Sequence, residues 1–509
     1  MAQSRANLDF VGWMYDIARD QSPTEDQLDS LCRKSIAAGY NAVGLYLEHR
    51  FAYKSAPWAA GPGAVQPAWI RRIQSRYSGK GFRIIPFLET LGHMEGFLRV
   101  EGGQSLAEAP TSGQGQICPS NPAAVKLAKG LVSDAIDTFS AETIHLGGDE
   151  TWQLGQCEKC KAREAKIGKA GIYAEHYAPL CQMVLDRGKR PAIWADMLLA
   201  HPEAVQAIPK QTLLFDWHYD RGPAETTRKL MDAGFDVVCC PTVHVFDSNW
   251  SDVDATYQNI DEHAKDAGDL RAKGVLVTSW EYNYLASFST YVPLIMAAGR
   301  RITKGESWQD AMTHAGSSAY AKAAGILGHD IPFASELLRP GNGPLLRYHF
   351  AMRLNPFYLW LAWRGEIHDC APRVLKLCDT ADREVPKTSA LRFPIALYRA
   401  GVRWTLAVDR AAEHYRARRF SQAQESLRQG KAEIHSLKPH VETSIRAGGA
   451  LPDRYRLQVL ERNVDEVIVK ISQIAALYQE SKALPAFESV VDGGYVAGDQ
   501  AAWRTGQGR

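Results

Sequence analysis

Residues 143–151 read Thr-Ile-His-Leu-Gly-Gly-Asp-Glu-Thr. The run Thr143–Leu146 is short, apolar and β-branched in character, which is typical of a buried strand. The two glycines that follow free the backbone to turn, so the adjacent Asp149 and Glu150 need not point to opposite faces. Two neighbouring acids in different environments can hold different charges at neutral pH. From spacing alone, an exposed acidic turn or a helix N-cap is the alternative interpretation.

The same pattern, a short apolar run followed by an amphipathic stretch, repeats over the first 280 residues. Such alternation is typical of the βα units that build parallel sheets. Eight units in about 290 residues match the count of a (β/α)8 TIM barrel, and a doubly wound open sheet is the alternative. The predicted strands are Phe10–Met14, Ala42–Leu47, Arg83–Leu88, Thr143–Leu146, Arg190–Trp194, Thr212–Asp216, Asp236–Cys240 and Gly274–Ser279.

From about residue 301 the pattern changes to long helical periodicity. Helices are predicted over Leu391–Ala417 and Ser421–Ala447, and Leu451-Pro452-Asp453 supplies a break and an N-cap before the last helix. One face of that helix carries apolar residues spaced by three and four, which predicts burial: Leu457, Leu460, Val464, Val467, Ile471, Ile474 and Tyr478. We therefore expect a catalytic barrel over residues 8–300, an α-helical domain over 301–488 and a loose tail over 489–509.

Composition excludes several classes of protein. Of the 509 residues, 45% are apolar and 23% are charged, as in soluble globular proteins. The 59 basic residues against 57 acidic ones give no basic footprint for nucleic acid. No stretch is apolar enough for a membrane span, the first ten residues lack a secretory apolar region, and the odd number of nine cysteines fits reduced thiols. The sequence predicts a cytoplasmic protein, unless a signal peptide has been removed, and a homodimer through the helical domain is an open possibility.

Polar and aromatic residues gather directly after the predicted strands, where parallel barrels carry their active sites. Aromatic faces bind C–H surfaces and carboxylates accept hydroxyl groups, so this set predicts a pocket for an uncharged sugar ring. Besides Asp149 and Glu150, the candidate site residues are Arg19, Glu48, His93, Trp194, Asp196, Trp217, Tyr219, Trp280, Glu281 and Tyr282.

The segment His145–Glu150 resembles the signature of glycoside hydrolase family 20, the β-N-acetylhexosaminidases, whose catalytic domain is a (β/α)8 barrel. Met14–Arg19 is similar to the first-strand segment of that family, and Leu91-Gly92-His93 is similar to its Pro-Gly-His turn. Three tryptophans also stand where the family places its pocket tryptophans: Trp194, Trp217 and Trp280.

The resemblance implies a cofactor-free retaining exo-glycosidase that removes a terminal β-linked N-acetylhexosamine, either GlcNAc or GalNAc. It implies substrate-assisted catalysis, in which the acetamido oxygen of the sugar attacks its own anomeric carbon. Glu150 would be the general acid and then the base, and Asp149 would orient the acetamido N–H and stabilise the oxazolinium ion. The three tryptophans would wall the pocket, and Glu48 with His93 would form a carboxylate–histidine relay to Glu150.

The sequence departs from the family pattern in four respects. Val11 stands where the family has an arginine that contacts sugar hydroxyls, so Arg19, Glu48 or Arg50 is expected to replace it. The tyrosine that normally follows the seventh strand is absent, which leaves Tyr219 or Tyr282 for the acetamido oxygen. The usual Trp-x-Glu is compressed to Trp280-Glu281, and the first strand begins too early for a preceding small domain, as in a single-barrel branch of the family.

Two other functions remain open on the sequence. The first is a retaining glycosidase in which Glu281 is a protein nucleophile, and this mechanism needs no acetamido group. The second is a sugar-binding barrel without catalysis.

Two further motifs are given a structural interpretation. Cys157 and Cys160 have metal-ligand spacing, but no second Cys-x-x-Cys or His pair follows, so we expect structural or incidental thiols and no metal. His145 lies within the predicted strand, so we expect a buried, hydrogen-bonded histidine.

Overall fold

The structure, a computed structural model, describes residues 8–19, 21–109, 115–245, 250–280, 285, 288–331 and 354–492. The chain forms two compact units. The first contains Met1–Val243, Ala255–Trp280 and Leu294–Ala311, and the second contains His244–Asp254, Glu281–Pro293 and Met312–Arg509, as far as these residues are described. The boundary that the sequence placed at residue 300 lies inside a helix, and the division into domains at 300 and 488 stays a prediction.

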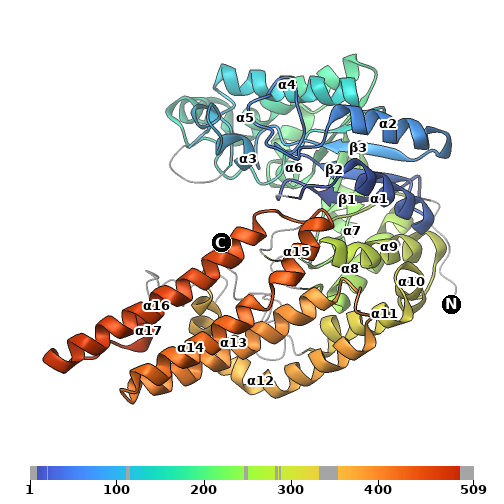
Figure 1. Cartoon of the computed structure of the whole chain (residues 1–509). Coiled ribbons are helices and arrows are strands. Elements are labelled where there is room, and N and C mark those ends of the chain that lie inside the picture. The colour runs from blue at the N-terminus through green and yellow to red at the C-terminus, as the bar shows by residue number, and fades with distance from the viewer. Residues whose placement is uncertain are drawn as a thin grey trace. The chain divides into compact units, whose positions relative to one another are not determined.

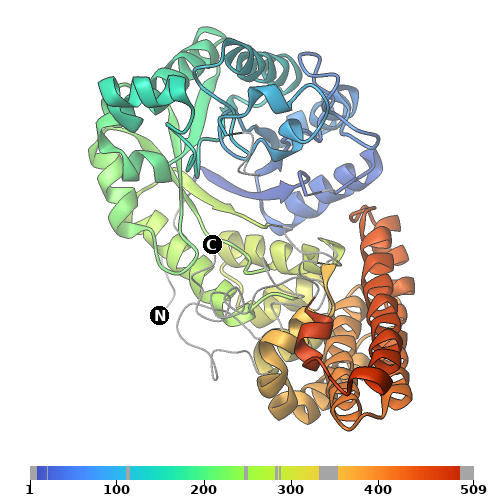
Figure 2. The same cartoon turned by 90° about the vertical axis from the view of Figure 1, so that its left-hand side faces the viewer.

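Eight parallel strands close into a barrel in the order of the sequence, with β1 paired to β8 (Figures 1 and 2). This closure confirms the predicted barrel and excludes the open sheet. All eight predicted strands are present, with ends that differ by at most two residues, because strand pairing stops at the rim where the loops begin. They are β1 Phe10–Asp16, β2 Ala42–Tyr46, β3 Arg83–Phe87, β4 Thr143–His145, β5 Arg190–Trp194, β6 Leu213–Trp217, β7 Asp236–Cys240 and β8 Gly274–Val277.

Helices follow the strands and surround them (Figure 2). Local sequence sets where they begin. Thr24 caps α1 with a capping box, in which its hydroxyl accepts the Gln27 N–H at 3.3 Å and its own N–H donates to the Gln27 side chain at 2.8 Å. The helices are α1 Glu25–Ala38, α2 Pro67–Tyr77, α3 Glu95–Leu98, α4 Pro122–Thr138, α5 Glu158–Asp186, α6 Asp196–Ala200, α7 Ala224–Asp232, α8 Val253–Leu270 and α9 Phe288–Lys304, with short 3₁₀ turns η1 Ser78–Lys80, η2 Gln104–Leu106 and η3 Pro202–Gln206.

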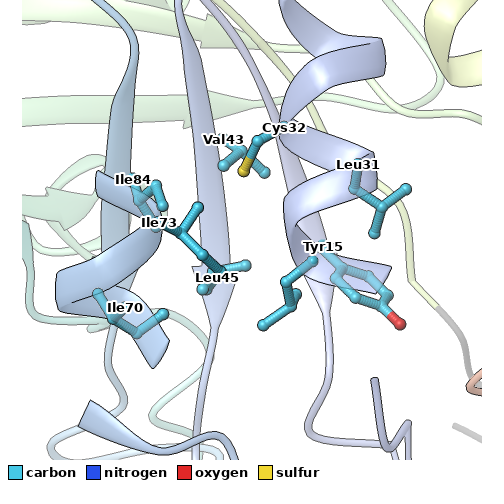
Figure 3. Close-up of a pocket in the computed structure, with 9 residues that line it drawn as sticks. Tyr15, Leu31, Cys32, Val43, Leu45, Ile70, Ile73 and Ile84 are labelled. Carbon is cyan, nitrogen blue, oxygen red and sulfur yellow. The ribbon is translucent and has the colours of Figure 1, made fainter. Parts of the chain in front are cut away.

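Apolar side chains fill both sides of the sheet. Inside the barrel, Phe87, Trp194 and Phe215 pack together, with ring centroids 5.5–6.0 Å apart. Outside it, an apolar pocket lies where α1 and α2 meet β1–β3 (Figure 3). The isoleucines of α2, Ile70 and Ile73, face this space, and burial there raises the pKa of the Cys32 thiol to about 12. The pocket is therefore helix–sheet packing with no reactive group.

The C-terminal region is helical, as predicted. Its elements are α10 Trp308–Ala315, α11 Ser318–Gly325, the π-helix η4 Ile326–Asp330, α12 Phe357–Glu384, α13 Arg392–Arg416, α14 Phe420–His435, α15 Lys438–Arg446, α16 Asp453–Ser481 and α17 Phe487–Val491. Helices α12, α13 and α14 pack in sequence, and α16 packs on α14 (Figure 1). The predicted apolar face of α16 is buried from Leu457 to Ile471, and Ile474 and Tyr478 are half-buried.

Two details of the helical prediction are wrong. The stretch Ser421–Ala447 is two helices, because the chain leaves the helix at residues 436 and 437 and Pro439 has no N–H to continue the ladder. Asp453 is the first residue of α16 and not its N-cap, and its carboxylate pairs with Arg456 at 2.8 Å. Within the described residues, no helix combines the length and the low polarity that crossing a membrane requires.

Gly44 of β2 provides a test of the packing inside the sheet. A Cβ at this position would lie 2.5 Å from the Phe87 ring of β3. We expect Gly44→Ala to destabilise the barrel by about 1–3 kcal/mol, the usual cost of overpacking. The control is Gly79→Ala, where a Cβ meets nothing within 4 Å. Thermal unfolding should separate the two variants, and equal midpoints would contradict this packing.

Candidate active site

Asp149 and Glu150 lie in the loop directly after β4. The turn before them uses positive φ angles, 81° at Gly147 and 105° at Gly148, which favour glycine. A Cβ on Gly148 would also lie 2.7 Å from the Tyr173 hydroxyl. Glu150 itself has a φ of 46°, and its N–H donates to Asp196 Oδ2 at 3.0 Å. The turn therefore sets both acids side by side at one end of the barrel.

The two acids differ in exposure. Asp149 is 6% exposed, whereas the side chain of Glu150 is 37% exposed. Burial raises the pKa of Asp149, and repulsion from Glu150 adds to this, while His93 and Arg19 oppose it. Among the described residues, no donor lies within hydrogen-bond distance of Asp149 Oδ1, although that atom is buried. Asp149 thus holds an acceptor that a bound N–H group can use.

His93 connects the two acids. Its Nε2 lies 3.2 Å from Glu150 Oε2 and 3.5 Å from Asp149 Oδ2. Burial alone would lower the pKa of His93, but Asp149, Glu150 and Glu95 raise it well above its usual range. The surrounding acids therefore favour the charged form of His93, which lies between Asp149 and Glu150.

The carboxylate that faces the other ring nitrogen of His93 is Glu95. Its Oε1 lies 3.8 Å from His93 Nδ1, and although burial raises the pKa of Glu95, the histidine lowers it to about 2. Glu48 instead pairs with His49 at 3.1 Å, and burial raises its pKa. The predicted relay named Glu48 as the partner of His93. In the structure Glu95 lies between them, since it faces His93 and its side chain is also hydrogen-bonded to Glu48, so the relay from Glu48 through His93 stays a prediction.

A third acid stands behind the pair. Asp196, at the start of α6, accepts the Glu150 N–H, and burial together with Asp149 and Glu150 raises its pKa to about 8. Below that pH Asp196 is neutral. It therefore supports the backbone of Glu150 without adding another negative charge beside Asp149.

Aromatic side chains from β2, β5, β6 and the segment after β8 line the same end of the barrel. Trp280 Nε1 donates to the Tyr219 hydroxyl at 2.8 Å, and the Trp280 ring lies 6.4 Å from that of Trp194. Trp217 packs on Tyr219 with ring centroids 5.1 Å apart. Tyr46, which sequence reasoning missed because it lies inside a predicted strand, meets Trp280 edge-on at 5.2 Å.

Arg19 lies within this group. Its guanidinium is 5.0 Å from the Tyr46 ring centroid and 5.3 Å from that of Trp280, and it pairs with Asp16 at 3.3 Å. The arrangement combines two acids, a histidine, an arginine and aromatic faces at one end of the barrel, and such groups can bind an uncharged polar ring and transfer a proton to it.

Comparisons with known proteins agree with this geometry. Residues 70–299 match the family model for the catalytic domain of glycosyl hydrolase family 20. Hexosaminidase D of Bos taurus is 22% identical over 283 residues, which are 51% of this chain and 81% of that protein. The chitobiase of Flavobacterium johnsoniae shares the fold with a TM-score of 0.52 and 16% identity, over 96% of this chain and 78% of its own. The exo β-N-acetylglucosaminidase of Vibrio harveyi matches at 16% identity and a TM-score of 0.47, over 64% of this chain and 58% of its own, so the chain spans less than two thirds of that enzyme.

The region that matches the catalytic domain of glycosyl hydrolase family 20, residues 70–299, lies within the barrel and contains Asp149 and Glu150. The resemblance to the β-N-acetylhexosaminidase family that the motif at Asp149 predicted is confirmed, and the chain is a glycoside hydrolase.

Within this family 20 barrel, most of the predicted site residues lie together. His93 and Asp196 contact Asp149 or Glu150, and Glu48 pairs with His49. Four aromatic residues and one arginine form a connected group at the same end of the barrel: Trp194, Trp217, Tyr219, Trp280 and Arg19. Glu281 and Tyr282 lie outside the described residues. Arg50 is directed to Ser22, whose Oγ accepts from its guanidinium at 2.7 Å, and Val11 is buried in β1. Of the two arginines, Arg19 is the one that lies beside Tyr46 and Trp280.

His145 is a structural residue of this barrel, as predicted. Its ring stacks on Phe87 with centroids 4.3 Å apart, and its Nδ1 accepts the Gly147 N–H at 3.1 Å. Complete burial lowers its pKa well below the usual range, so the ring is neutral. Its hydrogen bond helps to hold the glycine turn before Asp149.

Asp196 gives the barrel a pH-dependent stability that can be measured. In the unfolded chain an aspartate ionises near pH ~3.9, whereas folded Asp196 keeps its proton up to about pH 8. Between pH ~3.9 and about 8, the folded state binds one proton more than the unfolded state does at this position. The free energy of unfolding therefore falls as the pH rises through this range. Asp196→Asn does not titrate, so its melting temperature should improve relative to the wild type from pH 5 to 8 and then level off.

The control for this prediction is Asp186→Asn, which replaces an exposed acid at the end of α5. If the difference between wild type and Asp196→Asn stays flat with pH, or if both variants follow the same trend, the raised pKa of Asp196 is contradicted.

Proposed function

We propose that the protein is a retaining exo-β-N-acetylhexosaminidase that acts by substrate assistance. The observation that carries the proposal is the pairing of a buried acid that has an open acceptor, Asp149 Oδ1, with a half-exposed acid, Glu150. A mechanism that uses a substrate acetamide needs both: an acceptor for the amide N–H and a proton donor that reaches the leaving oxygen. The family match supports the same reaction class.

In the first step, the acetamido oxygen attacks the anomeric carbon as the bond to the leaving oxygen breaks. Glu150 donates its proton to that oxygen, and the sugar becomes an oxazolinium ion. In the second step, Glu150 takes a proton from water, the water oxygen attacks the anomeric carbon, and the acetamide is restored. Two inversions give net retention, and no covalent bond to the protein forms.

Asp149 stabilises the charge that develops. The acetamide nitrogen becomes positive in the oxazolinium ion, and an ionised Asp149 that accepts its N–H is worth most at that point. Burial opposes this ionisation, and the positive charges of His93 and Arg19 offset the burial. His93 contacts both Asp149 Oδ2 and Glu150 Oε2, so the ionisation of Asp149 and the protonation of Glu150 are electrostatically coupled through it.

The aromatic wall selects the sugar. Trp194, Trp217 and Trp280 would offer flat faces to the ring and the acetamido methyl group. Tyr219, whose hydroxyl accepts from Trp280, or Tyr282 would donate to the acetamido oxygen. Arg19 takes over hydroxyl recognition from the arginine that Val11 replaces. The substrate is a terminal non-reducing GlcNAc or GalNAc, with no cofactor or metal in the reaction.

The experiment that tests this function compares kcat/KM for aryl β-glycosides of GlcNAc, GalNAc and glucose. We expect turnover of an acetamido sugar and no turnover of the glucoside, and the ratio of GlcNAc to GalNAc fixes the specificity. Cleavage of the glucoside would instead support Glu281 as a protein nucleophile. Binding without turnover of any substrate would support a sugar-binding barrel.

Glu150→Gln tests the acid role. We expect it to slow natural glycosides by roughly 10²–10⁴-fold, because their leaving oxygen needs a proton. Aryl glycosides with good leaving groups should lose much less in the first step. Rates should be measured on both substrate classes, and equal losses on both would argue against Glu150 as the acid.

Asp149→Asn tests the electrostatic role. We expect kcat to fall while the dissociation constant of the product sugar changes little, since the charge that Asp149 stabilises exists only near the transition state. Steady-state kinetics combined with product-binding calorimetry separate the two effects. A loss of binding with an unchanged kcat would remove Asp149 from the mechanism.

The cytoplasmic location and the homodimer stay predictions. The location is supported by the nine cysteines, none of which forms a disulfide bond, as is usual in reducing compartments.

A further inference from the structure

Three cysteines and a glutamate converge beside the catalytic loops. Cys157 and Cys160 belong to the Cys-x-x-Cys motif at the start of α5, while Cys118 and Glu108 come from the loop between β3 and α4. The four ligand atoms all lie within 4.8 Å of one another. Sequence analysis found half of this cluster and rejected a metal for want of two more ligands. The fold supplies them.

The distances fit one metal ion of the size of zinc. Tetrahedral zinc with bonds of about 2.3 Å to sulfur and 2.0 Å to oxygen separates two sulfurs by about 3.8 Å and a sulfur from an oxygen by about 3.5 Å. Cys118 Sγ lies 3.5 Å from Cys157 Sγ and 3.7 Å from Cys160 Sγ. Cys160 Sγ lies 3.3 Å from Glu108 Oε2. These sulfur separations far exceed the ~2.05 Å of a disulfide bond.

Glu108 is the second line of evidence. It is 2% exposed, and among the described residues no lysine, arginine or histidine forms an ion pair with it. Its Oε1 accepts the Cys157 N–H at 2.9 Å, which directs Oε2 at the thiols. A buried carboxylate aimed at three thiols is costly unless a cation shares the space.

The surroundings also suit thiolates bound to a metal. The Cys160 N–H donates to Cys157 Sγ at 3.3 Å, at the positive N-terminal end of α5. The Ser120 hydroxyl lies 3.0 Å from Cys160 Sγ and accepts from Arg163 at 2.8 Å. These donors offset the excess negative charge of three thiolates and one carboxylate around a divalent ion, as the outer partners of metal sites do.

We propose that Cys118, Cys157, Cys160 and Glu108 bind one structural zinc ion. Binding replaces the three thiol protons with Zn²⁺ and releases them to solvent. All four positions are filled by the protein, so the site is closed and takes no part in hydrolysis.

The zinc cross-links the loop after β3 and the loop after β4, which carry His93 and Glu150. The segment of Cys118 pairs with that of His93, since the Met94 N–H donates to Gly115 O at 2.6 Å and the Ile117 N–H to Leu91 O at 3.0 Å. Cys157 lies seven residues after Glu150 in the β4 loop. A metal bound to both loops therefore fixes the separation of His93 and Glu150.

The test is the metal content of the full-length protein, purified in a non-thiol reductant and measured by elemental mass spectrometry. We expect about one zinc per chain. Protein stripped with a chelator and reloaded with Co²⁺ should show thiolate-to-cobalt charge transfer and the visible bands of tetrahedral Co²⁺. Both readouts are independent of hydrolysis, so a failure of the proposed activity leaves them unaffected.

Cys157→Ala and Glu108→Gln should weaken zinc binding by more than the roughly 10–100-fold that outer partners contribute, judged by competition with a chromophoric chelator. The matched control is Cys181→Ala, a buried thiol on the same helix outside the cluster, which should keep its full zinc. The proposal is overturned if the wild type neither contains zinc nor binds Co²⁺, if Cys157→Ala keeps the metal, or if peptide mapping finds Cys118 and Cys157 in a disulfide.

Discussion

The positive charge of His93 is the interaction on which the active site depends. Asp149, Glu150 and Glu95 lie around one imidazolium, in a position where burial raises the pKa of an isolated acid. Without the cation, the buried acids would take up protons and Asp149 would lose the charge that the chemistry needs. The neutral Asp196 fits the same balance, because it bonds the Glu150 backbone without adding to the repulsion.

The packing inside the barrel supports the loops that hold these charged groups close together. Its interior packs aromatic rings below the acids, and a neutral His145 under the glycine turn completes that layer. Glu48, His93 and Glu150 have positive φ angles, which are strained for residues other than glycine. The strands next to these loops fix the loop ends and so maintain the strained conformation. The strain falls on the residues after β2, β3 and β4, which are the strands that deliver the acidic and basic groups.

The sequence predicted the regular parts of the molecule well and the irregular parts less well, for physical reasons. Apolar runs predict the strands, and two consecutive glycines predict the turn after β4. The barrel and the pair Asp149 and Glu150 could therefore be found from the sequence. Glu95 could not, because the loop after β3 has no periodicity that tells which acid faces His93. Likewise, the split between α14 and α15 depends on local geometry that the helical pattern of the whole stretch conceals.

The cysteine cluster is another feature that the sequence pattern alone could not predict. Cys157 and Cys160 are adjacent in a motif, but Glu108 and Cys118 lie about fifty and forty residues earlier, on two arms of a loop joined by the bridge between Ala107 and Ile117. Only the fold brings them together. A family 20 site built on loops needs those loops held in register, since a displacement of His93 from Glu150 by 1 Å would break their 3.2 Å contact. The proposed metal would add to the backbone hydrogen bonds between Met94 and Gly115 and between Ile117 and Leu91, and it would tie this loop to the loop that carries Glu150.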